Sequence, residues 1–208
     1  MVGYKLFVEG GGDAKSLRIA CRNGFTEFFK QAGLVGKLPH VVSCGGRKKA
    51  YDDFCTAIQN REAAFLLVDS EDLVDEQHRG KPWRHLKQRK GDGWKQPGAA
   101  TEDHCHLMVA CMESWFLADA DRLKTFFGQG FNANALPARD REIESISRRN
   151  VANALSKATS QCKTKGCYKK GQHSFKILAQ IDPHKVCAAS PWAKRLIDTF
   201  RKNTPNQP

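Results

Sequence analysis

Two short apolar runs, each ending in an acidic cluster, constrain this 208-residue chain more than any other feature. The first run covers residues 4–8 and is followed by Glu9, three glycines and Asp13. The second covers residues 65–68 and is followed by two aspartates and a glutamate around one serine. Both runs have the length and the aromatic or β-branched content of buried strands. A carboxylate directly after a parallel strand lies at the carboxyl edge of the sheet, where open α/β folds bind ligands.

The first third of the chain alternates between strand and helix patterns. A helix is expected over residues 14–32, with Asp13 as its N-cap. Residues 39–42 form the second expected strand, and a helix from residue 47 to about residue 60 leads to the strand at 65–68. Strands and helices in this order, joined by right-handed crossovers, predict an α/β fold, in which a mainly parallel sheet is flanked by helices.

The rest of the chain contains one more strand pattern and a mainly helical end. Residues 70–101 are polar and too long for a plain connector, so they are either a functional loop or locally helical. The further elements expected are a strand at 106–110, a short helix at 113–119 and helices at 150–159, 173–181 and 191–201. We divide the chain into an α/β core, residues 1–130, and a basic, mainly helical extension packed on it, residues 131–208.

The net charge of +12 is concentrated in the second of these parts. Residues 131–208 carry 15 Lys and Arg against 5 Asp and Glu, or +10, whereas residues 1–130 carry 19 against 17, or +2. This imbalance favours a polyanionic partner, and nucleic acid fits best; a solubilising basic surface is the alternative. The candidate phosphate contacts lie in two basic segments, with solvated turns as the alternative: Arg47, Lys48, Lys165, Lys169 and Lys170.

The acidic residues at the two strand ends form a candidate metal site. Glu9, Asp69 and Glu71, with Asp72, meet at one point if the two strands are neighbours, and an extended backbone would point Asp69 and Glu71 the same way. Carboxylates this close repel one another, and Mg²⁺ or Mn²⁺ relieves the repulsion. Glu113 is equally well explained as a further member or as a first-turn glutamate that complements a helix dipole. The possible additional members are Asp13 and Glu113.

Cysteine usage and hydropathy indicate the compartment. The eight cysteines include no Cys-x-x-Cys pair, and their spacings are poor for structural zinc. The sequence has no recognisable signal peptide and no apolar run long enough to span a bilayer, so we expect a cytoplasmic protein without a membrane partner. The four tryptophans are expected in the core or at an interface rather than as base-stacking platforms.

The acidic motifs resemble the Toprim pattern of topoisomerases, primases and related nucleases. An apolar strand followed by Glu9-Gly10, with Asp13 a few residues on, is similar to the first Toprim motif. Asp69 and Glu71, two positions apart, are similar to the second, with Glu71 in place of its second aspartate. The resemblance implies a Toprim-like sheet, a general acid or base role for Glu9, and Mg²⁺ ligation by Asp69 and Glu71.

Over most of its length the chain also resembles a largely uncharacterised bacterial family, the domain of unknown function 4276. The resemblance is carried by short motifs spread along the chain: Val8-Glu9-Gly10, Gly45-Gly46-Arg47, residues 67–72, residues 112–119, Lys165-Gly166 and residues 190–193. The family resemblance implies a Toprim-like fold. Members often accompany an ABC-type ATPase in bacterial defence systems, which implies such a partner here.

Taken with the resemblance, these patterns predict a metal-dependent nuclease whose catalytic residues are Glu9, Asp69 and Glu71. It would act as the effector of an ATPase-linked antiphage defence system. The main alternative is a non-catalytic subunit of the same fold that docks a partner ATPase or nucleic acid. A phosphotransfer or nucleotidyl-transfer enzyme is the third possibility, and both DNA and RNA remain open as substrates.

Overall fold

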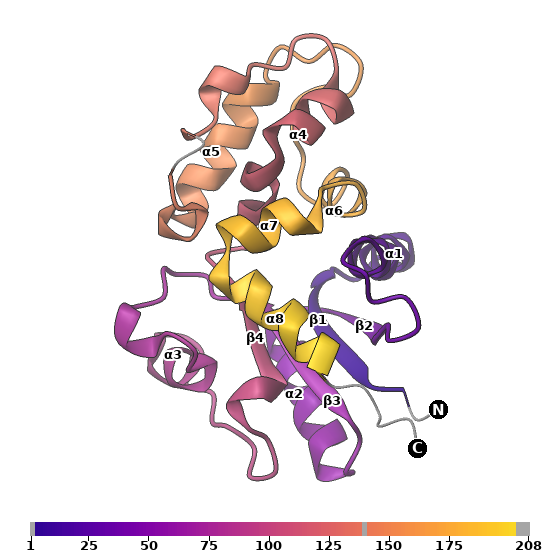
Figure 1. The fold of residues 1–208 in the computed structure, drawn as a ribbon, viewed down its shortest axis with the longest axis vertical. Coiled ribbons are helices and arrows are strands. Elements are labelled where there is room, and N and C mark those ends of the chain that lie inside the picture. Colours follow the sequence, from indigo (N-terminus) through magenta and orange to yellow (C-terminus); the bar gives the residue numbers. More distant parts are fainter. Residues whose placement is uncertain (1–2, 139–140, 203–208) are drawn as a thin grey trace.

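The computed structural model, which describes residues 3–138 and 141–202, is built on a four-stranded, all-parallel sheet (Figure 1). The predicted α/β fold is therefore confirmed. The strands lie in the order β2-β1-β3-β4. Their bounds are Lys5–Gly11 for β1, His40–Gly45 for β2, Ala64–Asp69 for β3 and Cys105–Met108 for β4.

Helices cover both faces of the sheet, because the strands bury side chains on both sides. In β1, Leu6 and Val8 pack into the core cluster that contains α1, whereas Phe7 packs into the cluster that contains α2. All six residues of β3 are buried, as expected of a parallel strand with both faces covered. The helices that cover the two faces are α1 (Lys15–Gln31) and α8 (Pro191–Lys202) on one, and α2 (Arg47–Gln59) and α3 (Pro82–Gln88) on the other.

The order of the strands reverses direction between β1 and β3. The chain passes from β1 through α1 to β2 on one side, then through α2 back across β1 to β3 on the other side. Since α1 and α2 lie on opposite faces, the carboxyl ends of β1 and β3 border a crevice. This reversal is the topological switch point at which open α/β sheets bind their ligands.

Most of the helices that follow β4 form a group at one end of the sheet (Figure 1). The helix at the end of the described chain, α8, runs back across the sheet, where the Phe200 ring lies 5.2 Å from that of Tyr4 and 5.3 Å from that of Phe65. The last helix therefore shares its core with the first strand. The helices of this group are α4 (Ala120–Phe127), α5 (Arg148–Thr159), α6 (Ser174–Leu178) and α7 (Pro183–Ala189).

Several segments to which the sequence assigned no definite secondary structure form short 3₁₀ helices. The polar stretch at residues 70–101 contains the 3₁₀ helix Glu76–His78 as well as α3, so it is locally helical, one of the two forms expected. The short helix predicted at 113–119 is also 3₁₀. The 3₁₀ segments are Glu76–His78, Glu102–His104, Met112–Asp119, Ala133–Ala135 and Ile143–Ser145.

The predicted N-cap of α1 is wrong. Ala14 occupies the cap position with no side-chain hydrogen bond. Asp13 is fully exposed, 3.7 Å from Arg18, because the preceding glycine turn directs its side chain outward. By contrast, the four tryptophans are all buried, as predicted. Within the described part of the chain, none of the helices has both the length and the apolar character that crossing a bilayer requires.

Candidate metal centre

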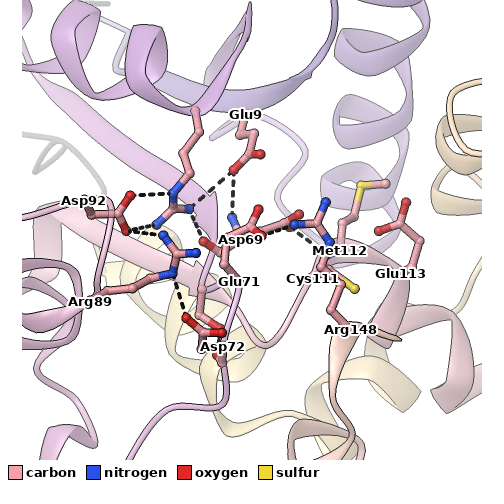
Figure 2. A network of polar contacts seen from close by, with 12 residues as sticks. Glu9, Asp69, Glu71, Asp72, Arg89, Asp92, Cys111, Met112, Glu113 and Arg148 are labelled. Carbon is pink, nitrogen blue, oxygen red and sulfur yellow. Dashed lines mark hydrogen bonds and ion pairs between the residues drawn. The ribbon is translucent and has the colours of Figure 1, made fainter. Parts of the chain in front are cut away.

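Three carboxylates from two adjacent strands converge at the switch point (Figure 2). Glu9 lies near the end of β1, Asp69 is the last residue of β3, and Glu71 follows two residues later. One oxygen from each lies within 4.8 Å of the other two. Carboxylate oxygens are the ligands that hard cations such as Mg²⁺ and Mn²⁺ prefer. Among the described residues, the side chains that converge in this way are three of the four ligands that the sequence predicted, and Asp72 is not one of them.

Asp69 and Glu71 come together by a turn, not by the extended backbone expected from the sequence. The strand ends at Asp69, and Glu71 has φ +67°, a left-handed conformation that few residues other than glycine adopt. Hydrogen bonds of 2.9 Å from Ser70 N to Met108 O and from Glu71 N to Ala110 O hold this turn against the segment after β4. Such a conformation costs about 1–3 kcal/mol and is found preferentially at ligand sites.

Of the three carboxylates, that of Asp69 is the most deeply buried and has the least favourable surroundings for a negative charge. The residue is 4% exposed, and its Oδ1 accepts a 2.8 Å hydrogen bond from Met112 N. Burial, together with the charges of Glu9 and Glu113, raises the pKa of Asp69 to about 8, against a smaller opposing effect of Lys170. A buried carboxyl surrounded by other carboxyls is the arrangement that a bound cation stabilises. The chemistry of the centre thus fits a metal ion.

Two arginines from distant elements contact the other two carboxylates. Arg47, at the start of α2, lies 3.4 Å from Glu9 Oε2 and also donates to the main-chain oxygen of Asp69. Arg148, at the start of α5, forms an ion pair with Glu71. Each cation partly offsets one negative charge and fixes the orientation of one carboxylate.

Arg47 is itself held in place by a loop that follows α3. Its guanidinium makes two hydrogen bonds to Asp92, at 3.1 and 2.6 Å, and lies 4.7 Å from the centre of the Trp94 ring. The Asp92 side chain is only 3% exposed, and it also lies 3.2 Å from Arg89. Burial raises the pKa of Asp92, but hydrogen bonds and charge from these arginines outweigh it and hold the pKa below its usual range. The predicted phosphate contact Arg47 is therefore already engaged within the protein.

Asp72 and Asp13, the other strand-end carboxylates, lie outside the converging group. Asp72 forms a 3.0 Å ion pair with Arg89, and its side chain is 68% exposed. The path of contacts from Asp72 runs through Arg89, Asp92 and Arg47 to Glu9 (Figure 2). Asp72 is thus connected to the centre through a row of ion pairs and not by its own oxygens.

Glu113 lines the same cavity as Glu9 and Asp69. It is 5% exposed, and its Oε1 accepts hydrogen bonds from Tyr168 Oη at 3.1 Å and Ser174 Oγ at 3.4 Å, with Lys170 Nζ at 3.7 Å. The cavity, with a volume of about 250 Å³, lies between the sheet edge and the helical group. Its lining residues include Glu9, Gly10, Leu17, Asp69, Met108, Met112, Glu113, Lys170, Ser174 and Phe175. Glu113 therefore lines the cavity beside the centre but is not one of the three converging carboxylates, and both explanations for it stay open.

The four predicted lysine contacts lie in different surroundings. Lys170 lines the cavity beside Glu113. Lys165 lies over the Phe126 ring at 4.8 Å, and Lys48 forms an ion pair with Asp52. The remaining one, Lys169, donates its backbone N–H to His173 Nδ1.

Two residues of the centre were not found by reasoning from the sequence. Asp92 belongs to a glycine-rich loop with no strand or helix pattern around it, and Arg148 lies 77 positions from its partner Glu71. The only available signal was the general excess of positive charge beyond residue 130, which includes Arg148.

The fold and the centre together define a class: an α/β protein with a parallel sheet and an acidic, metal-type cluster at its switch point. The chain belongs to the family described as Domain of unknown function (DUF4276), whose model matches residues 8–201. This confirms the resemblance to that family, whereas the Toprim resemblance stays a prediction. A search of curated proteins and a search of solved structures returned no match.

Proposed function

We propose that this chain is a metal-dependent nuclease that hydrolyses phosphodiester bonds at the Glu9–Asp69–Glu71 centre. The observation that carries the proposal is the convergence of these three carboxylates within 4.8 Å of one another at a sheet edge. The chain around them has a net charge of +12, so an acidic centre lies within a protein that attracts polyanions. The Toprim-like motifs support the same reaction class.

The three carboxylates would hold Mg²⁺ or Mn²⁺, which when bound stabilises negative charge on the phosphate oxygens. Glu9 is the residue suited to move a proton. Its two contacts, from Arg47 Nη1 at 3.4 Å and Asp69 N at 3.3 Å, both fall on Oε2. They orient the carboxylate and leave Oε1 to act on an attacking water. Lys170 and Arg148, both partly exposed, supply positive charge for the phosphate backbone.

We further propose a cytoplasmic protein that works with an ABC-type ATPase as the effector of a bacterial antiphage defence system. This part rests on the family resemblance and not on the geometry of the site. An ATPase-dependent rise in cleavage by the purified pair would support it. Equal cleavage with and without the ATPase would count against it.

The test of the nuclease is cleavage of DNA and RNA with Mg²⁺ or Mn²⁺, with and without the ATPase. Glu9→Gln should lower the cleavage rate by about 100-fold or more while the protein still folds and binds nucleic acid. Asp69→Asn should also weaken the response to added metal, because it removes a charged ligand. Asp13→Asn is the matched control, since this exposed carboxylate lies outside the centre. Wild-type activity in Glu9→Gln would exclude Glu9 from the mechanism. If the wild-type protein cleaves neither DNA nor RNA under any of these conditions, the alternative of a non-catalytic subunit that docks an ATPase or nucleic acid is favoured.

A further inference from the structure

The carboxylates of the centre are recessed. Asp69 and Glu113 are 4% and 5% exposed, and the side chains of Glu9 and Glu71 are 19% and 16% exposed. Glu9, Asp69 and Glu113 line a cavity of about 250 Å³. This volume lies below the ~300–1,000 Å³ of common small-molecule sites, so the cavity has room for one phosphate with one sugar or base.

Four apolar side chains line part of the cavity and are called the apolar wall here. They are Leu17 of α1, Met108 at the end of β4, Met112 at the start of the 3₁₀ helix that follows, and Phe175 of α6. A charged phosphate gains no favourable contact from apolar side chains. The flat face of a nucleobase, by contrast, packs on apolar and aromatic side chains. The cavity therefore combines a place for a phosphate with a place for an unstacked base.

The apolar wall is packed too closely to move aside easily. Helices α1 and α6 lie against each other (Figure 1). An added Cβ on Gly24 of α1 would lie 2.8 Å from the main-chain oxygen of Phe175. An added Cβ on Gly10 would lie 3.1 Å from the Phe175 ring. Phe175 thus fills the space that two glycines leave, and close packing of this kind resists deformation.

From these observations we infer that the substrate of the centre is an unpaired nucleic-acid strand, and that a continuous duplex does not reach the carboxylates. The inference rests on the proposed nuclease function and specifies its substrate. Metal-ligand distances of about 2.1 Å require the phosphate to enter the recess. A duplex is stiff and carries one charge per ~1.7 Å of its axis, so its neighbouring phosphates and second strand would meet the cavity walls first. A single strand can bend one nucleotide inward and place its base on the apolar wall.

The first experiment compares a short single strand with the duplex of the same sequence, in DNA and RNA. Binding is measured with Glu9→Gln protein and Mg²⁺, and cleavage with wild-type protein. We expect the single strand to bind and to be cut at least about tenfold better, because only it reaches the cavity. In a duplex with single-stranded tails, we expect cuts confined to the tails. Equal binding of both forms, or cuts within the paired region, would overturn the inference.

The second experiment fills the cavity from one side. Leu17→Trp should weaken single-strand binding by about tenfold, since it occupies the place of the base. Ile19→Trp is the matched control, because Ile19 lies two positions away on the same helix, is 40% exposed and does not line the cavity. Unchanged binding in Leu17→Trp, or an equal loss in both variants, would refute the role of the wall. Binding decides these outcomes even if no substrate is cut, so the inference and the nuclease proposal fail separately.

Discussion

The raised pKa of Asp69 predicts that, without metal, the protein loses stability as the pH rises. Burial and the charges of Glu9 and Glu113 raise this pKa from 3.8 to about 8. Between these two values the folded protein keeps a proton that the unfolded chain has released, so the free energy of unfolding falls with increasing pH. The contribution is complete below about pH 4 and is lost as the pH passes about 8. A difference of about 4 pKa units, at ~1.4 kcal/mol each, amounts to roughly 6 kcal/mol.

The assay is urea denaturation in EDTA at constant ionic strength, from about pH 5 to about pH 8.5. Wild-type stability should fall over this range, and Asp69→Asn should remove most of the fall, because the amide needs no proton to be neutral. Asp72→Asn, which changes an exposed carboxylate three positions away, should keep the wild-type profile. Added Mg²⁺ should restore about 2.7 kcal/mol at 100 times its dissociation constant. The same pH profile in wild type and Asp69→Asn would refute the reasoning.

Three further substitutions test the surroundings of the centre. Asp92→Asn removes the charge that holds Arg47, and Arg47 in turn orients Glu9. The Mn²⁺ affinity measured by calorimetry should therefore fall about tenfold, the lower end of the range for residues that orient metal ligands. Tyr168→Phe removes the hydroxyl that donates to Glu113 and should lower the free energy of unfolding by about 1 kcal/mol in urea denaturation. Arg148→Gln should lower the slope of log affinity against log salt concentration by about one, which corresponds to the loss of one phosphate contact. Fluorescence anisotropy of a labelled nucleic acid measures this slope.

The Arg148 substitution has a matched control within the chain. Arg79→Gln breaks an exposed ion pair with Glu76 and should leave the salt dependence unchanged. An unchanged Mn²⁺ affinity in Asp92→Asn would mean that Arg47 does not position Glu9. Unchanged stability in Tyr168→Phe would mean that the hydroxyl contributes nothing beyond what water supplies.

The sheet and the convergence of the three carboxylates were predictable because both depend on local patterns. An apolar run of four or five residues identifies a parallel strand, and the carboxyl ends of parallel strands lie at one edge of the sheet. Glu9 and Asp69 each lie near the carboxyl end of such a strand, so they meet once β1 and β3 are neighbours. The structure supplies that last condition, because β3 pairs directly with β1.

What could not be predicted depends on the path of the chain between elements. Asp92 meets Arg47 across 45 positions and Arg148 meets Glu71 across 77, and neither approach leaves a periodic trace in the sequence. The left-handed turn at Glu71 is equally hidden, because glutamate has no preference for φ > 0 and the surrounding contacts impose it.

The three carboxylates of the centre are not equivalent, and the difference bears on how a cation would enter. Glu9 and Glu71 each have an arginine partner, whereas the Asp69 carboxylate accepts a backbone N–H from Met112. Asp69 is also the most deeply buried of the three, and the charges of its neighbours raise its pKa. A divalent cation needs this carboxylate ionised, so below about pH 8 binding must displace the proton. Binding of a cation at Asp69 would therefore release a proton below about pH 8.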